Sequence, residues 1–198
     1  MGSIQPGWDI IMDFGAEHIP LLSLIVIPAV GWLHRQLSKL TQESIEQEQK
    51  IEAGNTCLML DCGFSVRETL SRLARLDRTG EELDAIVVTH EHGDHISGVG
   101  VLARNFNIPV WATAGTWRAI EHRVGDIPKR NVVDHHRPFV INDIEVIPFP
   151  VPHDAKEPVQ YVFDDGSARL GILTDVGQST PHIEEILSGL DALALECN

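Results

Sequence analysis

Residues 89–95, THEHGDH, directly follow the apolar run AIVV at positions 85–88. An uncharged run rich in β-branched residues predicts a buried strand, so three histidines and two acids are placed where that strand ends. His90 and His92 are two positions apart and therefore point to the same side of an extended chain, whereas Glu91 points away. The spacing predicts that the two imidazoles share one ligand.

The second half of this motif offers a further pair of polar side chains. Gly93 permits a tight turn, after which Asp94 and His95 can face back toward a second position a few ångströms away. Imidazole and carboxylate groups suit Zn²⁺ and related divalent ions, and an open metal site lowers the pKa of bound water to roughly 7. The motif therefore predicts a hydrolytic metal centre; the alternative is a polar loop whose histidines are exposed by chance.

The chain after residue 50 alternates apolar runs typical of strands with stripes typical of amphipathic helices. Two hairpins are predicted, one at Asn142-Asp143 and one at residues 164–166. The expected strands are residues 56–62, 85–89, 109–112 and 192–196, and the expected helices are residues 66–76, 95–106, 116–124 and 181–190. Hairpins and crossover helices in one core imply stacked sheets with helices outside, which is an α/β layered sandwich.

Charge and cysteine content narrow the function classes. With 15 Lys+Arg against 29 Asp+Glu, the formal net charge of −14 repels polyanions and excludes a broad basic nucleic-acid-binding face. A nucleic-acid substrate would need local help, for example from metal ions. The three cysteines, Cys57, Cys62 and Cys197, have no C-x-x-C spacing, so we expect reduced thiols in a cytosolic domain.

The H-x-H-x-D-H pattern after an apolar strand resembles the metal-binding signature of the metallo-β-lactamase superfamily. Three other segments extend the resemblance: EAGNTCLMLDCG at 52–63, VPHD at 151–154 and LTDVG at 173–177. Within the superfamily, GVGVLAR, PVWAT and LECN are similar to the bacterial YycJ-like branch of hydrolases and 5′-exonucleases. The resemblance covers residues 51–198 and implies an αββα sandwich.

The resemblance also implies roles for individual residues. The three histidines His90, His92 and His153 would hold one zinc ion, Asp94 and His95 the other, and Asp175 both. Asp61 would stabilise the loop that carries His90 and His92 without binding a metal itself. The catalytic residues would be Asp94 and Asp175. The alternatives are a hydrogen-bonded loop histidine at 153, a turn cap at 175 and a plain turn acid at 61.

The implied activity is hydrolysis by water activated between two divalent ions, Zn²⁺ first and Mn²⁺ second. The expected substrate is a phosphodiester, above all in nucleic acid attacked from its 5′ end. Two alternatives stay open, namely hydrolysis of a thioester or other small ester on the same scaffold, and a non-catalytic metal-binding fragment.

Several other polar residues are candidates for a role in the site, but each also has an ordinary structural explanation. The cations Arg123, Lys129 and Arg130 either contact substrate phosphate or form part of a scattered basic surface. Asp154 either steers His153 or is a solvated carboxylate. The remaining histidines are expected at the surface: His122, His135, His136 and His182.

Residues 1–50 are expected to form a separate helical extension, joined to a partial hydrolase domain at residues 51–198. Residues 19–33, IPLLSLIVIPAVGWL, carry no charge. As a helix they span only about 22 Å, short of a hydrocarbon core of roughly 30 Å. This segment is therefore either a membrane anchor for a cytoplasmic domain or a core helix kinked at Pro28. Residues 41–50, TQESIEQEQK, are expected to be a polar helical linker, in which residues 43–50 form a solvated helix face.

The sequence departs from the family pattern at two points. No Ser/Gly-rich opening turn precedes Glu52, and the Asn-His-Asp that usually follows the last strand would lie after Asn198. We therefore expect a truncated or rearranged member, with an incomplete sandwich and one ligand of the second metal missing.

Overall fold

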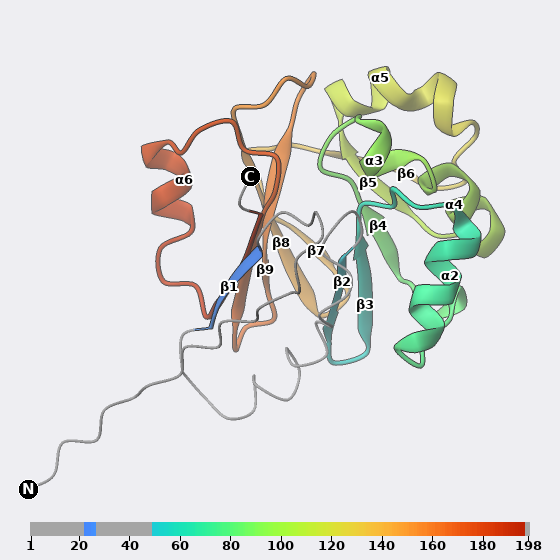
Figure 1. The fold of residues 1–198 in the computed structure, drawn as a ribbon, viewed down its shortest axis with the longest axis horizontal. Helices are drawn as coiled ribbons and strands as arrows, with labels where there is room; N and C mark the ends of the chain where they lie inside the picture. The colour runs from blue at the N-terminus through green and yellow to red at the C-terminus, as the bar shows by residue number, and fades with distance from the viewer. Residues whose placement is uncertain (1–21, 27–48, 197–198) are drawn as a thin grey trace, which may run out of the picture.

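The computed structural model describes residues 22–26 and 49–196 of the chain. Two β-sheets face each other in the interior, and helices cover the outer face of each sheet (Figure 1). The predicted α/β layered sandwich is therefore confirmed. The hairpins expected at Asn142-Asp143 and at residues 164–166 join β7 to β8 and β9 to β10.

One sheet has five strands in the order β2-β3-β4-β5-β6. Its strands β3 to β6 are parallel, and β2 is antiparallel to β3. The strands are β2 (Gln49–Ala53), β3 (Thr56–Leu60), β4 (Ala85–Val87), β5 (Val110–Thr113) and β6 (Arg130–Val133). The helical segments on this side are α2 (Val66–Arg75), η1 (Gly80–Glu82), α3 (Gly93–Ile96), α4 (Val99–Phe106) and α5 (Ala114–Val124). Because the strands are parallel, their carboxyl ends meet at one edge, where ligands of such sheets commonly bind.

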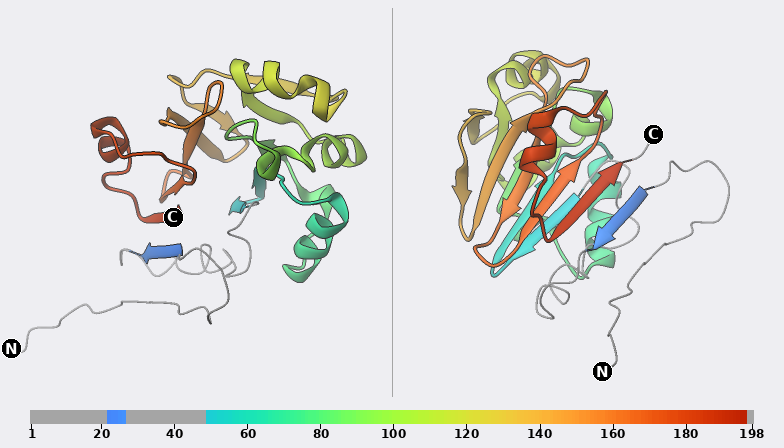
Figure 2. Two further views of the ribbon diagram at one scale, coloured as in Figure 1. Left: turned by 45° about the horizontal axis from the view of Figure 1, so that its top comes forward. Right: turned by 90° about the vertical axis from the view of Figure 1, so that its left-hand side faces the viewer.

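The other sheet has six strands in the order β1-β11-β10-β9-β8-β7. Neighbours are antiparallel except β10 and β11, which are parallel and joined through α6 (Pro181–Ile186). The strands are β1 (Leu22–Val26), β7 (Phe139–Ile141), β8 (Ile144–Pro150), β9 (Val159–Asp164), β10 (Arg169–Leu173) and β11 (Ala192–Glu196). Figure 2 shows α6 against the outer face of this sheet and β1 beside β11.

The layers follow from the two-residue period of the strands. On β3, Leu58 and Leu60 face the other sheet, whereas Cys57 and Met59 belong to the core beneath the helices. On β9, Tyr161 lies in the core between the sheets, whereas its neighbour Val162 packs in the cluster that contains Ile183 of α6. Strands β3 and β9 are thus buried on both faces, which explains why these two runs lack the alternating polar residues of a half-exposed strand.

The expected helix over residues 95–106 is instead two helices, α3 and α4. The chain breaks between them because Gly98 passes very close to the loop after β3. The Gly98 N–H donates to Cys62 O at 2.8 Å, and a Cβ on Gly98 would lie 2.3 Å from Phe64 O. The expected helix over residues 181–190 is also shorter, ending at Ile186 before Gly189, which has a φ of 72°.

The N-terminal expectation was wrong over Leu22–Val26, which form strand β1 rather than helix. This strand lies antiparallel to β11, with Leu24 opposite Ala194. The edge of β11 offers backbone groups that only another extended segment can pair, so tertiary pairing overrides the local helical pattern. The other residues of 1–48 lie outside the described part of the chain. Within 22–26 and 49–196, no helix has the length and apolar character needed to cross a membrane.

Candidate metal centre

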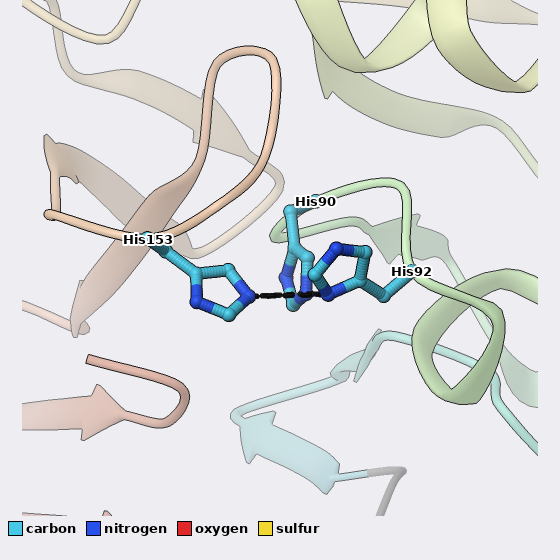
Figure 3. Close-up of side chains that lie close together, drawn as sticks. All are labelled: His90, His92 and His153. Atoms are coloured by element: carbon cyan, nitrogen blue, oxygen red, sulfur yellow. Dashed lines mark hydrogen bonds between the residues drawn. The ribbon is translucent and has the colours of Figure 1, made fainter. Parts of the chain in front are cut away.

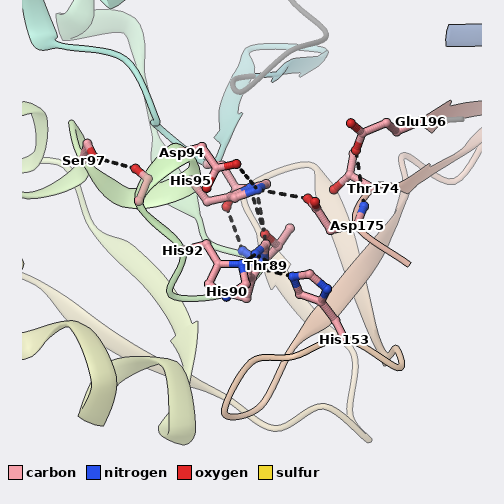
Figure 4. Close-up of polar contacts among 12 residues, drawn as sticks. Thr89, His90, His92, Asp94, His95, Ser97, His153, Thr174, Asp175 and Glu196 are labelled. Atoms are coloured by element: carbon pink, nitrogen blue, oxygen red, sulfur yellow. Dashed lines mark hydrogen bonds and ion pairs between the residues drawn. The ribbon is translucent and has the colours of Figure 1, made fainter. Parts of the chain in front are cut away.

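The residues predicted to form the site come from strand ends in both sheets and converge at one place (Figure 4). Asp61 follows β3, and His90 and His92 follow β4 in the five-stranded sheet. His153 follows β8 and Asp175 follows β10 in the six-stranded sheet. Two bonds fix the sheets to each other beside the site. Tyr161 Oη donates to Val88 O at 2.9 Å, and the Val159 N–H donates to Thr89 O at 3.1 Å.

Three imidazoles meet with their ring nitrogens almost in contact (Figure 3). His153 Nε2 lies 3.2 Å from His90 Nε2 and 3.1 Å from His92 Nδ1, and the latter two atoms are 3.0 Å apart. Two nitrogens bound to one tetrahedral zinc are separated by roughly 3.3 Å when the Zn–N bonds are about 2.0–2.1 Å. The three nitrogens therefore lie at the spacing that a shared cation requires.

Hydrogen bonding alone cannot satisfy this triangle. A ring nitrogen either bears a proton or has a lone pair, so among three mutually adjacent nitrogens at least two are alike and repel. Thr89 Oγ1 donates its proton to Asp61 Oδ2 at 2.8 Å and so accepts from His90 Nδ1 at 3.0 Å, which leaves His90 Nε2 with its lone pair. His153 Nδ1 lies 3.3 Å from Asp154 Oδ1, and a proton on Nδ1 facing that carboxylate would leave Nε2 with its lone pair. Two lone pairs would then face each other across 3.2 Å, an arrangement that a cation stabilises.

A second group of potential ligands lies next to the first and shares one member with it. The ligand atoms of His90, His95 and Asp175 all lie within 4.8 Å of one another. His95 Nε2 is 3.0 Å from Asp175 Oδ2 and 3.7 Å from Asp94 Oδ2. Asp94 is exposed and is not a member of either group of closely spaced ligand atoms. The sequence-based division of ligands between two metals thus differs from these groups in three residues: His90 belongs to both groups, Asp94 to neither, and Asp175 only to the second.

Asp61 is the hydrogen-bond hub behind these rings. Its side chain accepts from the Thr89 N–H at 2.8 Å, from Thr89 Oγ1 at 2.8 Å and from His95 Nδ1 at 2.9 Å. Asp61 is only 4% exposed and adopts a φ of 59°, a left-handed conformation that aspartate tolerates better than most residues. The hydrogen bond to Asp61 fixes the orientation of the His95 ring, so Nε2 is the nitrogen directed toward Asp175.

The electrostatics of the two neighbouring histidines differ. Burial, followed by the nearby charge of His95, lowers the pKa of His90 to about 3, so the His90 ring is uncharged at neutral pH. Burial by itself would also lower the pKa of His95, but the carboxylates of Asp61 and Asp175 raise it to about 10. The hydrogen bond from His95 in turn lowers the pKa of Asp175. The proton on His95 Nε2, which faces Asp175, therefore lies where a divalent cation would bind.

Sequence reasoning missed two contributors to the site. Glu196 Oε2 accepts from the Asp175 N–H at 3.3 Å, and Asp175 has a φ of 49°. Burial and the charge of Asp175 raise the pKa of Glu196. Thr89 orients His90 as described above. The sequence indicates these two residues only by their positions, because Thr89 closely follows β4 and Glu196 is the last residue of β11.

The remaining candidates fall outside the two ligand groups. Arg123 Nη1 donates to Glu91 O at 3.0 Å, so this cation lies beside the loop between β4 and α3 that carries His90 and His92. Arg130 lies over the ring of Trp117, 4.3 Å from its centroid. His135 is half-buried and pairs with Glu157 at 3.1 Å. The other three histidines, His122, His136 and His182, are exposed as predicted, and so is Asp154.

Comparisons with known proteins give a family match and relatives of similar sequence. A family model described as the beta-lactamase superfamily domain matches residues 56–198. The exodeoxyribonuclease YycJ of Bacillus anthracis is 36% identical over 143 residues, covering 71% of this chain and 54% of the relative. The exodeoxyribonuclease WalJ of Streptococcus pneumoniae serotype 2 (strain D39 / NCTC 7466) is 35% identical over 152 residues, covering 75% and 56%. The chain thus spans a little over half the length of these curated relatives.

A solved structure shares the fold. Zn²⁺-bound PqqB from Methylobacterium extorquens superposes with a TM-score of 0.63 at 20% identity, covering 74% of this chain and 58% of that one. At this level of identity the likeness concerns the arrangement of sheets and helices alone.

Proposed function

Since this chain belongs to the beta-lactamase superfamily, we propose that it is a metal-dependent hydrolase that cleaves phosphodiester bonds in nucleic acid as a 5′-exonuclease. The observation that carries the proposal is the close approach of three imidazole nitrogens, with His90 Nε2 and His153 Nε2 3.2 Å apart and His92 Nδ1 3.1 Å from His153 Nε2. The names of the two exodeoxyribonuclease relatives support DNA as the substrate class.

Two divalent ions, Zn²⁺ foremost and Mn²⁺ as the alternative, would be held by two sets of residues. The three-histidine set, His90, His92 and His153, would hold one ion, Asp94 and His95 would hold the other, and Asp175 would contribute to both. Ions bound there would lower the pKa of coordinated water and neutralise the negative charge that develops on a phosphate oxygen. They would also offset the repulsion between DNA and a chain of net charge −14.

The chain's own residues hold and orient this machinery. Asp61 fixes the His95 ring, and Thr89 fixes the His90 ring. We assign catalytic roles to Asp94 and Asp175, which flank His95 Nε2 at 3.7 and 3.0 Å. The Asp94 side chain is 51% exposed and therefore in contact with solvent, whereas the hydrogen bond from His95 lowers the pKa of Asp175 and keeps that carboxylate ionised.

The test is digestion of 5′-phosphorylated single-stranded DNA that carries a fluorescent label at its 3′ end. The expected result is a ladder that shortens from the 5′ end with Mn²⁺ or Zn²⁺ and stops with a chelator. His92→Ala should abolish the ladder, because it removes one nitrogen of the triangle. The matched control His122→Ala changes an exposed histidine of α5 and should leave the ladder unchanged. Undigested DNA under every metal condition would reject the exonuclease assignment.

The same preparation separates the alternatives. Hydroxyacylglutathione hydrolase of Aeromonas salmonicida is 46% identical over 52 residues, so thiol release from a glutathione thioester is the second assay. Metal content after removal of loosely bound ions tests the fragment alternative. A stoichiometry near two supports the dinuclear centre, whereas one metal per chain without turnover supports a non-catalytic fragment.

Membrane attachment through residues 19–33 is not carried into this proposal, because Leu22–Val26 pair with β11.

A further inference from the structure

Glu91 stands between His90 and His92 but points away from their nitrogens and reaches the other half of the site. Its Oε1 accepts from the backbone N–H of Lys156 at 2.8 Å. Lys156 lies three residues after His153, on the loop between β8 and β9. The side chain therefore crosses from the loop that carries two of the three histidines to the loop that carries the third.

The backbone of Glu91 is held as well. Its carbonyl oxygen accepts from Arg123 Nη1 at 3.0 Å, which ties the metal loop to the last turn of α5. The β8–β9 loop is anchored separately, because Thr113 Oγ1 donates to Glu157 O at 2.9 Å. Each loop is thus fixed to its surroundings, and the Glu91 carboxylate connects the two directly.

The environment of Glu91 argues against an ordinary solvated acid. Its Oε2 is buried and has no hydrogen-bond partner among residues 49–196. Burying a carboxylate oxygen without a partner is costly, whereas a side chain turned into water would avoid that cost. The conformation is therefore stabilised through the other oxygen and its bond to Lys156 N–H, which is the contact between the loops.

We infer that Glu91 is a positioning residue for the three-histidine half of the metal centre, an inference that rests on the metal centre proposed above. By holding the β8–β9 loop against the β4–α3 loop, it brings His153 Nε2 to within 3.2 Å of His90 and His92. Without the bond, the loop keeps its anchor at Glu157 but no longer holds His153 against His90 and His92, so the ion is bound with one fewer well-placed ligand.

The test measures metal affinity, which does not depend on DNA cleavage. Chelator competition gives the Kd for Zn²⁺, and the visible spectrum of the Co²⁺-loaded chain reports ligand number and geometry. Glu91→Ala should weaken binding by about 10- to 100-fold, the usual loss when a residue that orients a metal ligand is removed. Its Co²⁺ spectrum should lose the contribution of one imidazole. Glu121→Ala, an exposed acid on α5, is the control for loss of one negative charge.

Glu91→Gln separates the hydrogen bond from the charge. The amide oxygen can still accept from Lys156 N–H, so Gln should retain affinity and spectrum close to those of the unaltered chain. A loss in Gln equal to that in Ala would show that the charge matters and would overturn the inference. If Ala fails to fold, Glu91→Met preserves side-chain bulk but lacks the acceptor and should show the same weakening.

A double-mutant cycle tests whether Glu91 acts through His153. In a His153→Ala background, Glu91→Ala should cause no further loss of affinity, because the positioned ligand is already absent. Additive losses, or unchanged Zn²⁺ affinity and Co²⁺ spectrum in the Glu91→Ala single variant, would refute the positioning role. If the unaltered chain itself binds no metal, the proposed function fails as well, so the two failures are distinguishable.

Discussion

Removing the Asp61 carboxylate should destabilise the metal-free protein more than any exposed acid does. Asp61→Ala leaves three donors without an acceptor: the Thr89 N–H, Thr89 Oγ1 and His95 Nδ1. At about 1–3 kcal/mol for each buried unpaired group, with incomplete additivity, the loss is about 3–6 kcal/mol. Alanine at a φ of 59° adds about 1–2 kcal/mol. The total approaches the whole stability of a typical domain, about 5–15 kcal/mol.

Asp61→Asn gives a finer test because asparagine also tolerates the left-handed conformation. In the native site Oδ2 accepts two of the three bonds and Oδ1 accepts one. The amide oxygen can take the place of Oδ2 and keep two bonds, but the NH₂ group then faces the Thr89 N–H, donor against donor. The expected cost is about 1–3 kcal/mol.

Urea denaturation of chelator-treated protein, followed by circular dichroism, measures both variants. Asp77 is the matched control, since it has a φ of 54° but is exposed. Asp77→Ala isolates the conformational cost, about 1–2 kcal/mol, and Asp77→Asn should be close to neutral. If Asp61→Asn and Asp77→Asn have the same free energy of unfolding, the hub does not stabilise the fold and the reasoning is wrong.

Two further predictions concern the core beneath the helices. Burial, followed by the charge of Glu52, raises the pKa of the Cys57 thiol to about 12, so in a Cys197→Ser background the native chain should resist iodoacetamide at pH 8 and react once unfolded. Because the thiol ionises near pH 9.0 when unfolded, its contribution to stability is complete below pH 9 and is lost as the pH rises toward 12, which pH-dependent denaturation can measure. Gly100→Ala should destabilise by about 1–3 kcal/mol in thermal or urea unfolding, because its Cβ would lie 2.1 Å from Val124 O. A gain in stability, the usual result of this change inside a helix, would contradict the close packing of α4 on α5.

The local sequence pattern was sufficient to predict the strands whose side chains are buried on both faces of a sheet. The runs that became β3, β4 and β9 are buried on both faces, so their apolar continuity survives in the sequence. Helix α4 was merged with α3 because the break at Gly98 depends on Phe64, which is remote in sequence but adjacent in space. The pairing of β1 with β11 is likewise a tertiary contact that no local pattern encodes.

The same distinction applies to the candidate site. The motif at residues 89–95 and the isolated residues His153 and Asp175 could be recognised, because a strand end next to a histidine or acid is a local signal. The structure brings these residues together within hydrogen-bonding distance. The hydrogen bonds that orient these residues were not predicted, because they join residues far apart in sequence. The Lys156 N–H donates to Glu91, and the Asp175 N–H donates to Glu196.

The order of the ligands along the chain has a consequence for biosynthesis. His90 leaves the ribosome 63 residues ahead of His153, and Asp175 follows later still. A nascent chain that ends before β8 carries two of the three clustered imidazoles but has no partner loop to close over an ion. If the proposed metal centre is correct, tight binding of a cation becomes available only after translation has passed β10 and Asp175.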